Sequence, residues 1–159
     1  MATRSRVIVK EGKFVEIRKK LEFLGKGWVG VGVQEETKDR QDPRVDNPTV
    51  ALVNEFGTAT VPERSFLRAT MDARKNDIAR IRNAMLKDVI EGKKSPKAGL
   101  DIFGAWLAAA VRRTIVDKAD PPNAPATIAK KGFDDPLIHT KQLLNAVTHK
   151  VHVTEKRPK

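Results

Sequence analysis

The run WVGVGV, residues 28–33, predicts a β-strand, because valine alternates with tryptophan or glycine at the period of two that strands require. Glycine on one face of a strand marks a place where another backbone or a helix comes close. We therefore expect a helix, or a neighbouring subunit, to lie across this strand. A second alternating run, residues 147–153, predicts a strand near the C-terminus that returns to join the first.

Helical periodicity occupies most of the chain around these strands. The predicted helices cover residues 14–24, 50–56, 66–91 and 100–118, with a short one around Leu143 and Leu144. A β-branched run at 7–9 predicts a further short strand, and residues 120–136, which hold four prolines, are expected to be irregular. Few strands separated by helices predict an α+β fold, with a small, mostly antiparallel sheet packed against three to four helices and long irregular loops.

The chain has 159 residues, the size of one domain, and no repeat or shift in composition divides it, so we predict a single domain over 1–159. Residues 34–48 form a long polar connection with two prolines, which predicts a flexible arm that contacts a neighbour. The candidate contact residues of this arm are Lys38, Asp39, Arg40 and Arg44. Residues 155–159 form a charged tail.

The chain is strongly basic, with a formal net charge of +11. Such a charge favours polyanionic neighbours, above all nucleic acid, so a basic nucleic-acid-binding protein stays open as an alternative function. The basic residues of the predicted helix at 66–91 include Arg74, Lys75, Arg80, Arg82 and Lys87. Because this helix lacks interleaved aromatic residues, only contact with backbone phosphate is expected, and most of these cations should face solvent or protein partners.

No residue pattern predicts catalysis, a cofactor or a metal site, and we expect a protein that is not an enzyme and has no small-molecule substrate. The chain has no cysteine, which removes disulfides and thiolate chemistry. Residues 25–30 match G-x-G-x-x-G, but that motif must follow a strand and open a helix, whereas here the order is reversed. His149 and His152 are three residues apart, so a strand directs them to opposite faces and they cannot share a metal ion.

The ends and the hydropathy of the chain bear on its location. Residues 1–10 carry no signal-peptide pattern, and no run reaches the roughly 18 apolar residues of a membrane span. We therefore expect no membrane partner, and a protein that is made in a cytoplasm and used there or in a particle assembled there.

Two runs resemble a family of tailed-bacteriophage proteins, the tail-completion and virion-morphogenesis proteins. The first run is ALVNEFGT at 51–58 with VPERSFL at 61–67, and it is similar to the family's E-F-G-T and I-P-A-R-P-F-L motifs. Glu63 and Ser65 stand where the family usually has alanine and proline.

The second run extends from 125 to 151 and contains PATIAKKG at 125–132, PLI at 136–138 and QLLNAV at 142–147. It is similar to the family's P-A-T-I-A-R-K-G and P-L-I-D-T-G-x-L-L-N-S-I motifs. His139 and Lys141 stand where aspartate and glycine are usual. Together the two runs cover about a quarter of the chain, in the family's order.

These runs have the character of a scaffold. Phe56 is expected to be an apolar plug before a turn at Gly57, and Pro62 to fix the chain before Phe66 docks the next helix. Pro136 is expected to pin an extended segment. The candidate structural or interface anchors are Glu55, Phe56, Gly57, Pro62, Phe66, Leu67, Pro136, Leu137, Leu143 and Leu144.

The resemblance implies a structural virion protein that forms a ring at the head–tail junction, completing the tail or joining it to the DNA-filled head. The ring would be sixfold or twelvefold, and its partners would be the adjoining portal or adaptor and the tail-tube or terminator proteins. DNA would pass through the channel with weak contact. Such rings close through heterologous contacts related by rotation.

Overall fold

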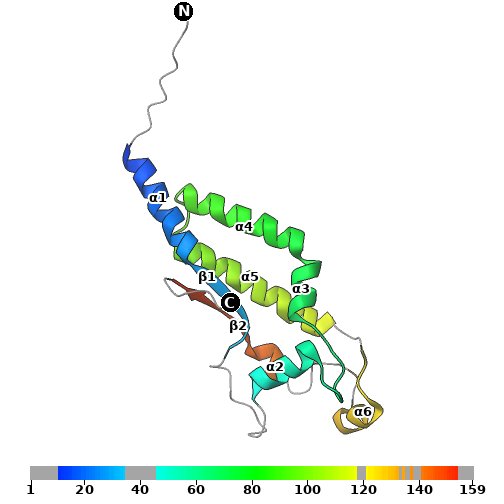
Figure 1. Ribbon diagram of the computed structural model, residues 1–159. Helices are drawn as coiled ribbons and strands as arrows, with labels where there is room; N and C mark the ends of the chain where they lie inside the picture. The colour runs from blue at the N-terminus through cyan, green and yellow to red at the C-terminus, as the bar shows by residue number, and fades with distance from the viewer. Residues whose placement is uncertain are drawn as a thin grey trace, which may run out of the picture.

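The computed structural model describes residues 11–34, 46–117, 121–132, 134, 137 and 141–153 (Figure 1). Over these residues, β1 (Trp28–Val33) and β2 (Val147–His152) form one antiparallel sheet, in which Trp28 lies opposite His152. The helices are α1 (Glu11–Lys26), α2 (Asn47–Phe56), α3 (Leu67–Ala73), α4 (Lys75–Ile90), α5 (Pro96–Asp117), α6 (Pro125–Lys131) and α7 (Gln142–Ala146). Both alternating runs are confirmed as paired strands, and the α+β class is confirmed.

Several sequence predictions fall outside the described residues. They are the β-branched run at 7–9, the contact residues Lys38, Asp39, Arg40 and Arg44, the residue Pro136, and the tail at 155–159. The last two residues of the predicted arm, Asn47 and Pro48, are instead the first two of α2. The Asp46 carboxylate caps this helix by accepting a hydrogen bond from the Thr49 N–H at 2.8 Å. A capping aspartate and a proline in the first turn favour this early start.

Helix α5 packs across the sheet on the face that carries the valines of β1. A Cβ atom at Gly104 would lie 2.7 Å from Cγ1 of Val29 and 2.6 Å from Cδ2 of His149, so only glycine allows α5 to come this close. The predicted helix across residues 28–33 is therefore confirmed, but the predicted reason is wrong. The glycine that admits the contact belongs to the helix, while Gly30 lies on the other face, beside Trp28 and His152.

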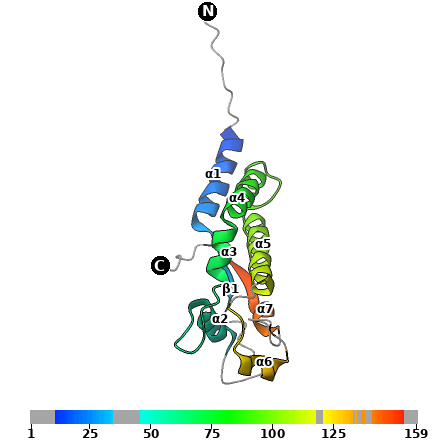
Figure 2. The ribbon, with the colours of Figure 1, turned by 90° about the vertical axis from the view of Figure 1, so that its right-hand side faces the viewer.

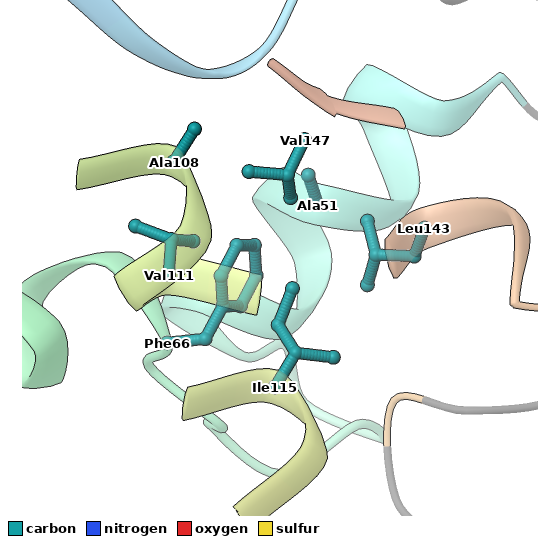
Figure 3. Packing of buried hydrophobic residues seen from close by; sticks show 7 residues of the cluster. All are labelled: Ala51, Phe66, Ala108, Val111, Ile115, Leu143 and Val147. Atoms are coloured by element: carbon teal, nitrogen blue, oxygen red, sulfur yellow. The ribbon is translucent and has the colours of Figure 1, made fainter. Parts of the chain in front are cut away.

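The core lies where α2, α5 and α7 meet the sheet (Figure 3). Phe66 is its largest fully buried side chain, and Val111, Ile115 and Val147 are also fully buried. Ala51 and Leu143 complete the cluster from α2 and α7. Residues from both resembling runs therefore meet in one core, although Phe66 and Leu143 are far apart in sequence.

The single helix predicted over 66–91 is two helices that meet at a bend. Arg74 joins α3 to α4 with φ −106° and ψ 12°, so the backbone leaves helical geometry at this one residue. The Arg74 N–H donates to the Thr70 carbonyl at 3.0 Å, and the Ile78 N–H donates to the Arg74 carbonyl at 2.8 Å. No glycine or proline occurs in residues 66–91, so the sequence pattern carries no break that marks the bend.

Part of the stretch predicted to be irregular, residues 120–136, is helical. Proline is favourable at the first position of a helix, where its missing N–H has no partner to lose, and Pro125 begins α6 in this way. Gly132 ends the helix in the left-handed conformation, with φ 82°. The prediction of irregular backbone over 120–136 is therefore wrong for residues 125–131.

Helix α1 extends beyond the rest of the molecule (Figures 1 and 2). The helix predicted over 14–24 is confirmed and ends at Lys26, but its apolar residues are only partly covered. Phe14 and Leu21 are largely exposed, whereas Ile17 and Leu24 are half-buried. None of the helices in the described part of the chain is both long and apolar enough to span a membrane.

Candidate functional site

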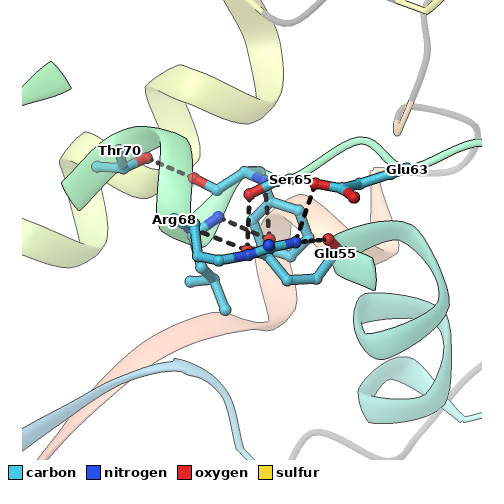
Figure 4. A network of polar contacts seen from close by, with 7 residues as sticks. Glu55, Glu63, Ser65, Arg68 and Thr70 are labelled. Atoms are coloured by element: carbon cyan, nitrogen blue, oxygen red, sulfur yellow. Dashed lines mark hydrogen bonds and ion pairs between the residues drawn. The ribbon is translucent and has the colours of Figure 1, made fainter. Parts of the chain in front are cut away.

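The first resembling run folds into a joint between α2 and α3 that is centred on the Glu55 carboxylate (Figure 4). Glu55 is only 3% exposed. Its Oε2 accepts hydrogen bonds from the N–H groups of Phe66 and Leu67, both at 2.8 Å. Its Oε1 accepts from the Ser65 hydroxyl at 2.8 Å and from the Arg68 N–H at 3.0 Å. One side chain at the end of α2 therefore caps the start of α3.

The hydrogen bonds decide the charge state of this carboxylate. Burial by itself raises the pKa of Glu55, because it removes water from the charged form. Hydrogen bonds from the backbone of Arg68 and Leu67, the Ser65 hydroxyl and the Arg68 side chain outweigh burial and hold the pKa below its usual value. Glu55 is therefore a fixed anion whose oxygens are already occupied by donors.

Arg68 closes the joint from outside. Its Nε donates to Glu55 Oε1 at 3.1 Å, and its Nη2 donates to Glu63 Oε1 at 3.0 Å and to the Glu55 carbonyl. The guanidinium carbon lies 4.8 Å from the centre of the Phe56 ring, in a cation–π contact. Arg68 therefore holds the Phe56 side chain against the joint on one face.

Gly57 makes the turn that the joint requires. Its φ of 71° lies in the left-handed region that favours glycine. A Cβ atom here would lie 2.9 Å from the Glu63 nitrogen and 3.1 Å from the Val61 oxygen. The Thr58 N–H donates to that same Val61 carbonyl at 2.8 Å, which closes the turn. The predicted turn at Gly57 is confirmed.

Arg64 ties the joint to the segment that follows α5. It is 6% exposed, and its Nε and Nη2 donate to the carbonyls of Pro121 and Pro122, each at 2.8 Å. Its own N–H donates to the Asn54 carbonyl at 2.7 Å. Sequence reasoning missed the roles of Arg64 and Arg68, since a basic residue in a polar run carries no sign of burial or pairing.

The predicted anchors divide into buried and exposed residues. Phe66 and Leu143 lie in the core, and Leu67, Leu137 and Leu144 are half-buried against it. Pro62 is exposed. Phe56 is 60% exposed, so it is not a core residue of this chain, and its role as an interface anchor stays a prediction. The physical reason is the phase of α2: its buried face carries Asn47, Ala51 and Glu55 at a spacing of four, and Phe56, one residue on, points about 100° away from that face.

The remaining ionisable groups of interest are paired at the surface. Asp77 accepts from Arg80 at 2.9 Å and from Arg74 at 3.4 Å, and these hydrogen bonds lower the pKa of its carboxyl. His149 contacts Asp101 at 2.9 Å, while His152 stacks on Trp28 with ring centres 3.8 Å apart. No group of three or more metal-ligating side chains occurs among the described residues.

Two exposed apolar surfaces stand out. Leu52 and Phe56 are each 60% exposed and lie four residues apart on α2; we call them the α2 ridge. Elsewhere, a groove of about 520 Å³ opens between α1, the start of β1, α4 and α5. We call it the α1–α4–α5 groove, and its lining includes Leu24, Trp28, Arg82, Met85, Leu86, Leu100 and Phe103.

Comparison of the chain with family models, curated proteins and solved structures found no match.

Proposed function

We propose that this chain is a structural protein of a tailed-bacteriophage virion, forming a ring at the head–tail junction through which DNA passes. The observation that carries the proposal is the Glu55 joint. The run that resembles the family's E-F-G-T motif folds into a closed set of hydrogen bonds and leaves the adjacent Phe56 60% exposed. A motif that makes a rigid support and presents an aromatic residue suits assembly.

The chemistry of the joint favours this proposal over catalysis at the same residues. The two Glu55 oxygens accept from four different residues over 65–68. A carboxylate in this state has little remaining capacity to take a proton from a substrate, and its pKa is lowered and not raised towards neutrality. The joint therefore acts as a support for the surface beside it.

The arrangement of charge suits weak contact with DNA. Arg74 and Arg80 both pair with Asp77, and Lys87 lies 3.9 Å from Glu91. Cations that already have carboxylate partners release fewer counterions on meeting phosphate. In the ring we propose, most of these side chains face solvent, the adjoining portal or adaptor, or the tail-tube or terminator protein.

A genetic experiment tests this function. Disrupting the gene in the phage or prophage that encodes it should yield DNA-filled heads and tails that are not joined, as counted by negative-stain electron microscopy. Supplying the wild-type chain in trans should restore joined particles. Normal yields of infectious, joined particles without the protein would refute the proposal.

A second candidate function, nucleic-acid binding, is favoured by one observation, the formal net charge of +11. Its test is the salt dependence of duplex binding, which is given as a prediction below.

A further inference from the structure

We propose that the α1–α4–α5 groove, together with the apolar stripe of α1 that continues from it, binds an acidic amphipathic helix of another protein. The inference goes beyond the ring proposed above, because it names the chemistry of a partner and does not depend on where the chain acts.

The groove supplies one end of an apolar floor. Leu24, Met85, Leu100 and Phe103 give it a mainly apolar lining, and its volume is about 520 Å³. The lining comes from three helices and the start of β1, so an apolar side chain that enters from outside is covered on several sides. This is the chemistry of a pocket that takes one anchor residue of a partner.

The α1 stripe, which consists of Phe14, Ile17, Leu21 and Leu24, extends this floor away from the groove. Its residues follow one another at steps of three and four. Phe14 is 60% exposed and Leu21 is 47% exposed, on the part of α1 that extends beyond the rest of the molecule (Figures 1 and 2). At 1.5 Å per helical residue the stripe is about 15 Å long, which is nearly three helical turns. A partner helix with apolar residues at the same spacing can pack along α1 and place its last apolar side chain in the groove.

The charges along this surface favour a negative occupant. Arg82 is the charged residue in the groove lining, and within the described part of the chain it pairs with no carboxylate, unlike Arg80 on the same helix. Glu16 and Glu22 of α1 are already paired, with Lys20 and Arg18. A partner that brings its own carboxylates can therefore pair with Arg82, whereas a basic partner is repelled. The formal net charge of +11 adds to the attraction.

A second copy of the chain offers no such helix among the described residues. Helices α1, α4 and α5 each hold more Lys and Arg than Asp and Glu, by five to three, four to two and three to two. The one acidic residue of α2 is Glu55, which is buried. The helices α3, α6 and α7 have at most seven residues, too few to cover the α1 stripe. The occupant is therefore a helix of a different protein.

A designed peptide tests the class of partner. The probe is a fluorescein-labelled peptide of three heptads, with leucine at the first and fourth positions and glutamate or alanine elsewhere. In fluorescence anisotropy it should bind the full chain at least about tenfold more tightly than a scrambled peptide of the same composition, or than a peptide with lysine in place of glutamate. Equal binding of the scrambled peptide would show attraction by charge alone and overturn the proposal. The absence of saturable binding up to about 0.1 mM would also overturn it.

Two matched pairs of variants locate the binding. Leu21→Glu breaks the α1 stripe, and Val116→Glu makes the same change at a site of α5 that is 57% exposed and lies outside the groove and the stripe. Arg82→Glu reverses the cation of the groove, and Lys87→Glu makes the same charge change on α4, about 140° around the helix. Leu21→Glu and Arg82→Glu should each weaken binding of the acidic peptide by about tenfold, whereas the two controls should change it by less than about twofold. Equal effects within both pairs overturn the proposal.

Two other polyanions complete the experiment. Phosphatidylglycerol vesicles and duplex DNA present negative charge without an apolar helical face. If either binds the chain more tightly than the acidic peptide and loses that binding on Leu21→Glu, the surface belongs to a membrane or to nucleic acid and the proposal is overturned. None of these outcomes depends on whether joined virions require the protein, so this proposal and the proposed function fail separately.

Discussion

The guanidinium of Arg68 lies 4.8 Å from the centre of the Phe56 ring while it also bonds to Glu55 on the buried side of the joint. One side chain therefore links a buried anion to an exposed aromatic. Because the same group serves both, Phe56 is held in place although it contributes little to the core. The two phenylalanines of the motif therefore have different roles: Phe56 is held at the surface, and Phe66 is buried in the core.

Replacing the two phenylalanines should have very different effects on stability. Phe66→Ala removes a fully buried ring and should cost about 3–5 kcal/mol of unfolding free energy. Phe56→Ala removes an exposed ring and its cation–π contact, and should cost about 1 kcal/mol or less. Urea unfolding followed by circular dichroism measures both values. Similar losses for the two variants would contradict the burial described here.

Replacing Glu55 should destabilise the protein in a pH-dependent way. Glu55→Gln replaces one accepting oxygen by an NH₂ group that faces other donors, so donors are left unpaired. The substitution should lower the free energy of unfolding by about 1–3 kcal/mol at neutral pH. The folded pKa of Glu55 lies below its unfolded value, so its contribution to stability is fully present above the unfolded value. That contribution is lost as the pH falls through the folded pKa. The difference in melting temperature between wild type and Glu55→Gln should therefore shrink in acid, and a difference that is constant from neutral pH to about pH 3 would count against the assignment.

Two alanine substitutions for glycine should have opposite signs. Gly57→Ala forces a side chain into a left-handed backbone with a 2.9 Å contact to the Glu63 nitrogen, and should cost about 1–3 kcal/mol. Gly12→Ala adds a methyl group in α1 with no atom within 4 Å, and should stabilise the helix by up to about 1 kcal/mol. Thermal unfolding of both variants against wild type checks the prediction. Stabilisation by Gly57→Ala would contradict the left-handed backbone of the turn at Gly57.

Binding to duplex DNA should be weak and steeply dependent on salt. Arg74 and Arg80 already pair with Asp77, so we expect them to make few phosphate contacts. Each such contact contributes a slope of about 0.9 in a plot of log affinity against log salt. Complexes seen by gel shift at low salt should be lost near physiological ionic strength, about 0.15 M. Tight, sequence-specific binding that survives this salt would favour the nucleic-acid-binding alternative over the structural one.

The sequence predicted those features that depend on local pattern. Alternation over 28–33 and 147–153 predicts both strands. The segments predicted at 14–24, 50–56 and 100–118 correspond to α1, α2 and α5, although α5 begins four residues earlier than predicted. The bend at Arg74 could not be predicted, because no glycine or proline stands near it in the sequence. The prolines of residues 120–136 predict irregular backbone and hide α6, although proline is favourable in the first turn of a helix.

The candidate site was predicted in position but not in detail. Phe56 and Phe66 have the same side chain, but Phe56 lies off the buried face of α2, whereas Phe66 lies in the core. Glu55 is among the predicted anchors, but its burial and the role of Arg64 could not be found from the sequence, because many of their partners are backbone groups brought together by the fold. Almost every residue type has the same backbone N–H and C=O groups, so the sequence does not show which of them will be partners.

The pairing of β1 with β2 constrains the order in which the chain can fold. Trp28 and His152 are 124 positions apart, so the sheet cannot close until the ribosome has released almost the whole described chain. Contacts between distant residues slow folding, because a long loop must be ordered before they form. During synthesis the valine face of β1 is covered only after α5 has been made, and the edge of β1 is paired only after β2 has been made. In that interval the unpaired strand exposes the nascent chain to misassociation.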